Sequence, residues 1–247
     1  MAAAQDNSSR SRSALVTGAS RGLGLALTRR LLALGWDVTV DARDRARLEE
    51  SLSDAPGPGR LTVVPGDVAD AEHRHALAAA ARSRGQLHLL VNNASVLGPS
   101  PQPGLAEYPL ETLRSVYEVN VFAPLSLSQL LLPALARVGG TIVNVSSDAA
   151  VEAYPGWGGY GSAKAALDHL SAVLAVEHPD VRVLALDPGD MATDLQQQAF
   201  PGEDVSDRAD PESVVPVLLQ LVEDRRPSGR YRVADLAAGT TSRAVPV

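Results

Sequence analysis

A tyrosine and a lysine lie four positions apart in the stretch GGYGSAKAAL, as Tyr160 and Lys164. The apolar spacing that follows predicts a helix over residues 160–177. Side chains at positions i and i+4 of a helix share one face, roughly 6 Å apart. The pair therefore either faces water on a surface helix or places an ammonium beside a phenol at a site of chemistry.

The chemistry that such a pair permits is proton exchange. An unperturbed phenol has a pKa of about 10, too high for ready exchange at neutral pH. A cation at about 5 Å, with an effective dielectric constant of about 20, stabilises a phenolate by roughly 3 kcal/mol, or about two pKa units. Tyr160 would then act as a general acid or base. Ser147, which ends the apolar run IVNVSS, would either hydrogen-bond a substrate oxygen or cap the end of a strand.

Short runs of Val, Leu and Ile alternate with longer helical patterns, as is typical of a parallel sheet buried on both faces. With right-handed crossovers this predicts an α/β protein with a doubly wound parallel sheet (a Rossmann fold) in three αβα layers. We expect a flexible N-terminal tail over residues 1–12 and one catalytic, dinucleotide-binding domain over residues 13–247. The expected strands are Ala14–Val16, Val38–Val40, Leu61–Val64, Leu87–Val91, Thr141–Val145, Val181–Leu186 and Tyr231–Val233. The expected helices are Gly22–Leu34, Ala46–Leu52, Glu72–Ser83, Glu111–Arg137, Tyr160–Glu177 and Pro211–Glu223.

A glycine-rich loop, TGASRGLG, follows the first expected strand and opens a helix. Glycines there allow a tight turn and let backbone N–H groups and the helix N-terminus approach a phosphate. The second strand ends in VTVDARD, where Asp41 would suit a ribose hydroxyl. Arg43 and Arg21 are both expected near the same place, and two guanidinium groups suit an additional 2′-phosphate. NADP is therefore favoured over NAD.

Taken together, these motifs resemble the short-chain dehydrogenase/reductase family in its single-domain, NADP-preferring form. The resemblance runs from TGASRGLG at 17–24 to DPGDMATD at 187–194, through GDV, NNA, VYEVN, IVNVSS and YGSAK. It implies reversible reduction of a small-molecule ketone or aldehyde to an alcohol. It implies the catalytic residues Ser147, Tyr160, Lys164 and Asn120, with Lys164 also binding the nicotinamide ribose. Asn120 would hold a water for proton return, or be a polar residue bonded to backbone.

The resemblance also implies which residues bind the cofactor. They are Gly18, Ser20, Arg21, Gly22, Leu23, Gly24, Arg43, Asp67, Val68, Asn93, Ala94, Tyr160, Lys164, Pro188, Gly189 and Thr193. Small residues around Tyr160 would let the cofactor lie against its helix. One departure is Ser95, which stands where the family carries the glycine of NNAG; we expect it not to touch the reacting atoms. The C-terminal stretch also lacks the family's common glycine-paired ending, which weakens predictions of a tetramer.

The expected substrate pocket contains Ser147, Trp157, Tyr160, Met191 and Phe200, although Trp157 and Phe200 would equally suit a core position. Residues 191–210 would form either a lid over this pocket or a plain surface loop. The substrate itself, its stereochemistry and the direction of reaction are left open by these residues.

Composition excludes several other classes of function. The chain has 247 residues, no cysteine and a formal charge of −7, which argues against disulfides, zinc–sulfur sites and nucleic-acid grooves. No metal site, nucleic-acid partner or membrane association is expected. We expect a cytoplasmic enzyme that forms a homodimer or homotetramer. The alternative is a catalytically silent redox sensor or scaffold that binds the dinucleotide, although such proteins usually lack the tyrosine or the lysine.

Overall fold

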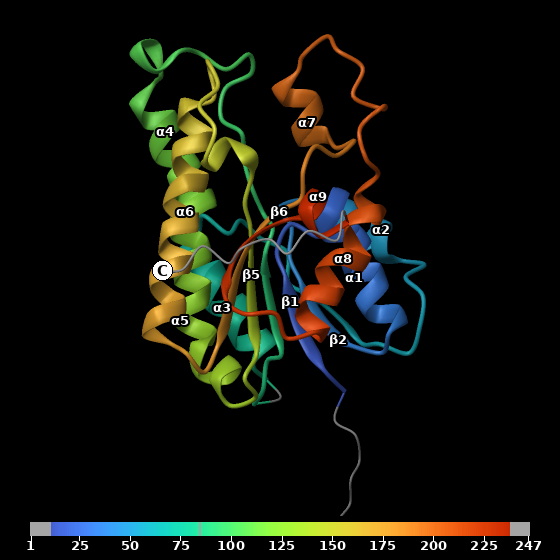
Figure 1. Ribbon diagram of the computed structural model, residues 1–247. Coiled ribbons are helices and arrows are strands. Elements are labelled where there is room, and N and C mark those ends of the chain that lie inside the picture. The colour runs from blue at the N-terminus through green and yellow to red at the C-terminus, as the bar shows by residue number, and fades with distance from the viewer. Residues whose placement is uncertain (1–10, 84, 238–247) are drawn as a thin grey trace, which may run out of the picture.

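The fold centres on a sheet of seven parallel strands, seen in a computed structural model that describes residues 11–83 and 85–237 (Figure 1). The spatial order is β3-β2-β1-β4-β5-β6-β7. The strands are β1 (Ser13–Val16), β2 (Asp37–Val40), β3 (Leu61–Val63), β4 (Leu89–Asn92), β5 (Thr141–Val145), β6 (Arg182–Asp187) and β7 (Gly229–Arg232). The predicted doubly wound parallel sheet is confirmed.

Helices cover both faces of the sheet, which gives the three predicted layers (Figure 1). One layer contains α1 (Gly22–Ala33), α2 (Arg45–Leu52) and α8 (Pro211–Glu223), and the other contains α3 (Ala71–Ala81), α4 (Leu110–Tyr117), α5 (Ala123–Ala136) and α6 (Gly158–Glu177). Two short helices, α7 (Asp194–Ala199) and α9 (Val233–Ala237), were not expected, because six and five residues are too few for a clear helical pattern.

Strand β1 explains why the apolar runs lack polar alternation. Ala14 and Val16 pack into the core under α1 and α8, whereas Leu15 points into the core under α3 and α5. All three side chains are fully buried. A strand covered on both faces needs apolar residues at consecutive positions.

The predicted long helix over 111–137 is interrupted in its middle. Helix α4 continues through a π-helical segment, Glu118–Phe122, into α5. The whole span Leu110–Ala136 is long and apolar enough to cross a bilayer, but half of its most apolar window is buried inside the protein. It therefore has the character of a core helix of the fold.

The crossover from β1 to β4 creates the place where a ligand can enter. Strands β1 and β4 pair directly, with Val16 opposite Val91, although β2 and β3 follow β1 in the chain. The connections leave these two strands toward opposite faces of the sheet. A crevice at the carboxyl ends of such strands is the usual binding site in this fold. The expected tail over 1–12 and domain end at 247 lie largely outside the described residues.

Candidate active site

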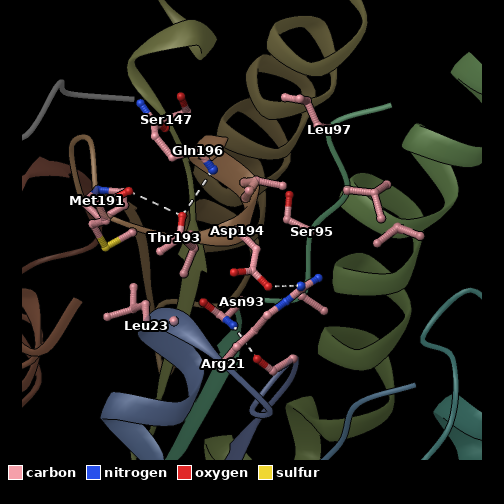
Figure 2. A pocket seen from close by; sticks show the side chains of 18 of the residues that line it. Arg21, Leu23, Asn93, Ser95, Leu97, Ser147, Met191, Thr193, Asp194 and Gln196 are labelled. Carbon is pink, nitrogen blue, oxygen red and sulfur yellow. Dashed lines mark hydrogen bonds and ion pairs between the residues drawn. The ribbon is translucent and has the colours of Figure 1, made fainter. Parts of the chain in front are cut away.

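A cavity of about 230 Å³ lies at the carboxyl ends of the central strands (Figure 2). It joins the glycine loop to the Tyr160 helix. The predicted residues that border it are Gly18, Ser20, Arg21, Gly22, Leu23, Arg43, Asp67, Val68, Asn93, Ala94, Ser147, Trp157, Tyr160, Lys164, Pro188, Gly189, Met191 and Thr193. Gly24, Asn120 and Phe200 were also predicted for the site but do not border this cavity.

The glycine loop needs its glycines for two different reasons. Gly18 has a φ of +68°, and a Cβ there would lie 3.0 Å from the Cα of Ala94. Gly24 would place a Cβ 2.4 Å from the carbonyl oxygen of Gly18, so it lets α1 pack against the loop rather than facing the cavity. Asn93 braces the loop from β4, donating to the carbonyls of Thr17 and Gly18 at 2.8 and 3.2 Å.

Asp41, at the end of β2, is held inside the protein although it borders the cavity. Its side chain is 1% exposed. Oδ1 accepts a hydrogen bond from the Gly18 N–H at 2.9 Å, and Oδ2 lies 3.1 Å from Nε2 of His73. Burial raises the pKa of Asp41, and its contacts with His73 and Gly18 oppose that rise. One carboxylate oxygen of Asp41 therefore contacts the glycine loop, and the other contacts His73 of α3.

The two arginines expected to converge have different surroundings. Arg21 forms an ion pair with Asp194 in the first turn of α7 (Figure 2). Arg47 approaches the same carboxylate at 3.3 Å. Arg43 borders the cavity and makes no ion pair with any residue in the described ranges. Both arginines border the cavity, and Arg21 is in addition held by a carboxylate from a distant segment, α7.

Tyr160 and Lys164 lie on the buried side of α6, so the surface-helix alternative is wrong. Their exposures are 6% and 2%. The Lys164 Nζ lies 5.4 Å from the centre of the Tyr160 ring and donates to the carbonyl of Val145 at 2.7 Å. Burial lowers the pKa of Lys164 to about 8, with Asp168 opposing the change.

The expected acidification of Tyr160 is not what this structure has. The pKa of Tyr160 is raised, and the largest cause is burial, to which Asp148 and Asp187 add; the hydroxyls of Ser95 and Ser147 oppose the rise by hydrogen bonding. The helical spacing correctly put a cation close by. The spacing argument did not include the cost of forming a phenolate away from water, and burial is here the largest cause of the raised pKa.

Both serines near the phenol have defined partners. Ser147 donates to Asp148 Oδ1 at 2.8 Å and accepts from the Ala149 N–H at 3.2 Å, so it caps a short 3₁₀ turn while also bordering the cavity. Ser95 donates to Oδ1 of Asn120 at 3.2 Å. Ser95 borders the same cavity as Tyr160, and the expectation that it does not touch the reacting atoms stays a prediction.

Asn120 lies in the π-helical segment and is fully buried. Its side chain donates to the Val96 carbonyl at 2.9 Å and accepts from the Val96 N–H at 3.0 Å. These two bonds match the backbone-bonded alternative that the sequence left open. They anchor the loop that carries Ser95.

The small residues around Tyr160 pack against protein, which corrects the expectation that they accommodate a cofactor. A Cβ at Gly158 would meet the side chain of Leu105 at 2.3 Å, and one at Gly159 would meet the ring of Tyr108 at 2.3 Å. At Gly161 it would lie 2.6 Å from the Ala149 carbonyl oxygen. Close approach of two other segments, one around residues 105–108 and one at Ala149, to α6 requires these glycines.

The Tyr160 side of the cavity has an apolar wall. The rings of Trp157 and Tyr160 meet nearly at right angles, with centroids 5.9 Å apart, and Phe200 packs against Trp157 at 6.0 Å. Phe200 thus supports the wall instead of facing the cavity. The wall is completed by Leu97, Leu195 and Ala199, which no motif in the sequence singled out. Over the described part of the chain, no three acidic or histidine side chains gather as a metal site would need.

The fold and the site together define a dinucleotide-binding oxidoreductase of the single-domain type. The defining features are a doubly wound parallel sheet, a glycine loop at its crevice and a buried tyrosine–lysine pair. The chain belongs to the short chain dehydrogenase family, whose model matches residues 12–204. The predicted family is confirmed.

Characterised relatives include reductases. The chain is 34% identical to the benzil reductase ((S)-benzoin forming) of Saccharomyces cerevisiae, covering 83% of this chain and 79% of that one. It is 33% identical to the L-xylulose reductase of Bos taurus, covering 96% and 94%. Among solved structures, a short chain dehydrogenase from Shigella flexneri complexed with NADP has a TM-score of 0.81 and 27% identity, covering 90% of this chain and 97% of that one.

Proposed function

We propose that this chain is an NADP(H)-dependent reductase that reversibly converts a small-molecule ketone or aldehyde to an alcohol. The observation that carries the proposal is the position of the Tyr160 hydroxyl. Tyr160 borders the same cavity as Ser147, Lys164 and the glycine loop. A proton donor and a dinucleotide cradle therefore share one space.

The cavity suits a nicotinamide dinucleotide. Gly18 and Gly22 both have positive φ values where the loop borders the cavity, and a Cβ at Gly189 would project into open space. These glycines would hold the diphosphate and the nicotinamide side, and Lys164 would hold ribose hydroxyls. When bound, the cofactor supplies or accepts the hydride.

Two observations support NADP over NAD. Arg43 borders the cavity without an ion-pair partner among the described residues, so its guanidinium is available to a 2′-phosphate. Asp41, the acid that would favour a ribose hydroxyl, has both oxygens occupied by Gly18 and His73. The Shigella relative was solved as a complex with NADP, which supports the same choice.

Three side chains would have different roles in the proton transfer. In reduction, the Tyr160 hydroxyl donates its proton to the substrate oxygen as negative charge develops there. Ser147 steadies the same oxygen by turning its hydroxyl from Asp148 toward the substrate. Lys164 provides positive charge behind the phenol and so favours the phenolate that remains.

The apolar wall points to a substrate with an aliphatic or aromatic substituent beside the carbonyl. Leu97, Trp157 and Leu195 would cover that substituent and exclude water from the reacting atoms. The relation to a benzil reductase supports aryl ketones as the first compounds to test.

A self-association surface and a cytoplasmic location are part of the proposal. Exposed apolar side chains lie on the α4–α6 layer, including Leu110, Phe122 and Val176 at 65%, 50% and 62% exposure. Apolar groups that would be covered by a second copy support a homodimer or homotetramer. Half of the most apolar window within Leu110–Ala136 is buried inside the protein, which supports a core helix over a membrane-inserted one.

The deciding experiment measures NADPH and NADH oxidation at 340 nm against a panel of aryl ketones, aliphatic ketones, aldehydes and ketoses. Turnover of at least one carbonyl with NADPH, matched by formation of the alcohol, is expected. Tight NADPH binding by calorimetry without turnover of any panel member would favour the redox sensor or scaffold instead.

A further inference from the structure

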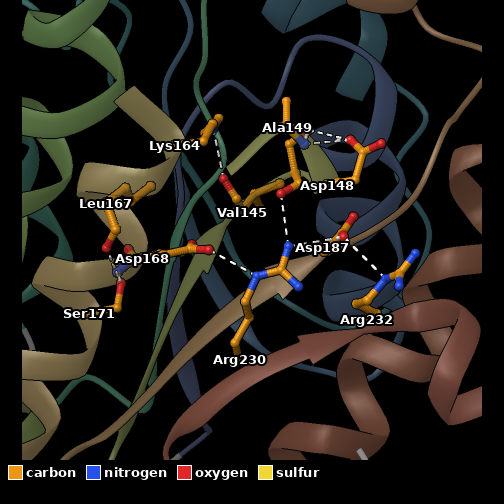
Figure 3. A network of polar contacts seen from close by, with 12 residues as sticks. Val145, Asp148, Ala149, Lys164, Leu167, Asp168, Ser171, Asp187, Arg230 and Arg232 are labelled. Atoms are coloured by element: carbon orange, nitrogen blue, oxygen red, sulfur yellow. Dashed lines mark hydrogen bonds and ion pairs between the residues drawn. The ribbon is translucent and has the colours of Figure 1, made fainter. Parts of the chain in front are cut away.

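A guanidinium group lies behind Lys164 and touches three segments that build the site (Figure 3). Arg230, on β7, donates through Nε to Asp168 Oδ2 at 2.9 Å. Its Nη2 donates to the backbone carbonyl of Ser147 at 2.8 Å and to Asp187 Oδ2 at 3.1 Å. One side chain therefore joins helix α6 to the segment that follows β5 and to the last residue of β6.

Asp168 occupies a special place in this arrangement. It follows Lys164 by four positions on α6, so both side chains lie on one face of the helix. The Asp168 side chain is 15% exposed and that of Arg230 is 18% exposed. The second carboxylate oxygen of Asp168, Oδ1, is buried and has no hydrogen-bond partner in the described part of the protein. A buried ammonium is stable only with a compensating charge nearby.

We propose that Asp168 is a positioning residue that keeps Lys164 an ammonium, and that Arg230 holds the Asp168 carboxylate in place for this task. The catalytic consequence rests on the proposed function above. The charge of Lys164 is nevertheless a property of the protein alone and is measurable without a substrate.

The charged groups around Lys164 influence one another's pKa values in turn. Burial lowers the pKa of Lys164 and Asp168 opposes this change. Burial in turn raises the pKa of Asp168, and Ser146, Arg230 and Lys164, in that order, oppose the rise. The remaining charged groups at this place have other contacts. Asp187, from β6, pairs with Arg230 and, at 3.6 Å, with Arg232 of β7, whereas Asp148, which follows β5, accepts from Ser147 and Tyr154.

The chain offers a direct probe, because Lys164 is its only lysine. Protein labelled with ¹³C at lysine Cε gives one side-chain signal, whose chemical shift reports the charge of Lys164 as pH changes. For the wild-type protein, the midpoint is expected near pH 8. In Asp168→Asn it is expected about one to two pH units lower, as loss of an opposite charge one helical turn away predicts. The matched control is Glu177→Gln, which removes an exposed charge near the end of the same helix and should leave the midpoint unchanged.

A second variant covers the case in which Asp168→Asn leaves Arg230 unpaired and fails to fold. The double variant Asp168→Asn, Arg230→Gln removes both partners, and its lysine midpoint is also expected below that of the wild type. A midpoint equal to the wild-type value in either folded variant overturns the proposal.

Activity measurements distinguish a failure of this proposal from a failure of the proposed function. In Asp168→Asn the alkaline limb of the kcat profile should move to lower pH together with the lysine midpoint, while KM for the carbonyl changes little. A profile that stays in place while the lysine midpoint moves would overturn the catalytic part. Absence of any turnover by wild-type protein would count against the proposed function, and the lysine titration would still decide the role of Asp168.

Discussion

Arg21 in the glycine loop forms an ion pair with Asp194 in α7, a residue 173 positions away in the chain. Arg47 of α2 reaches the same carboxylate. The pair ties the segment after β6 to the side of the cavity where the cofactor phosphates are expected. The ion pair gives the segment 191–210, which was predicted to be either a lid or a plain surface loop, a fixed contact beside the cavity.

The Asp194 carboxylate should weaken cofactor binding, because it adds negative charge beside the phosphate site and occupies two arginines. Asp194→Asn is expected to tighten NADPH binding by about three- to tenfold. Calorimetric titration measures this, and the gain should shrink at 1 M salt. Because the pair is half exposed, the free energy of unfolding should fall by less than about 1 kcal/mol. Asp54→Asn, which breaks the Arg29 pair away from the cavity, is the control; weaker NADPH binding in the Asp194 variant would contradict the prediction.

Arg43 should determine the choice between the two cofactors. Arg43→Asp is expected to weaken NADPH binding by about 10- to 100-fold and NADH binding much less, because a charge-assisted bond to the 2′-phosphate becomes a repulsion. Dissociation constants for both cofactors measure the difference. Arg45→Asp, at a nearby exposed position paired with Glu49, should change neither constant appreciably. Equal losses for NADPH and NADH would remove the 2′-phosphate assignment.

Tyr160 should be needed for turnover and not for cofactor binding. Tyr160→Phe keeps the ring against Trp157 but removes the proton donor, and kcat is expected to fall by about 10²- to 10⁴-fold. Steady-state kinetics measure the loss, and NADPH calorimetry checks that the cavity is intact. Activity within a few-fold of the wild type would show that another group protonates the substrate.

Ser95 should tune the phenol. Its hydroxyl opposes the raised pKa of Tyr160, so Ser95→Gly should raise that pKa further, and alcohol oxidation should require a higher pH. A hydrogen bond of about 0.5–1.5 kcal/mol corresponds to a shift of about 0.4–1.1 pH units in the kcat profile. Ser95→Thr keeps a hydroxyl and should keep the wild-type profile. Superimposable profiles for the glycine variant and the wild type would rule out this role.

The exposed apolar surface of the α4–α6 layer should mediate self-association. Phe122→Glu places a charge at a half-exposed aromatic position and is expected to convert the assembly to monomers. Light scattering coupled to size-exclusion chromatography measures the mass. Leu34→Glu, at an exposed position beyond α1 in the opposite layer, should leave the mass unchanged. A wild-type protein that is already monomeric would contradict the proposed assembly.

Much of the fold was predictable from local pattern. Consecutive apolar residues such as Leu89, Leu90 and Val91 must be covered on both faces, and only a parallel sheet between two helical layers achieves this. The predicted strand Thr141–Val145 and helix Pro211–Glu223 have the observed bounds. The glycine loop was also predictable, because its position between a strand and a helix is itself a local feature.

By itself, the sequence therefore determined the family, the layer architecture and the position of the glycine loop, since these follow from local motifs, periodicity and spacing. Only the tertiary structure decided the electrostatics. Asp41 contacts Gly18 and His73, and Arg21 forms an ion pair with Asp194. Burial raises the pKa of Tyr160 although Lys164 is close. These contacts and this pKa depend on which distant parts of the chain meet and on how much water surrounds each charged group. Neither can be read from the spacing of neighbouring residues.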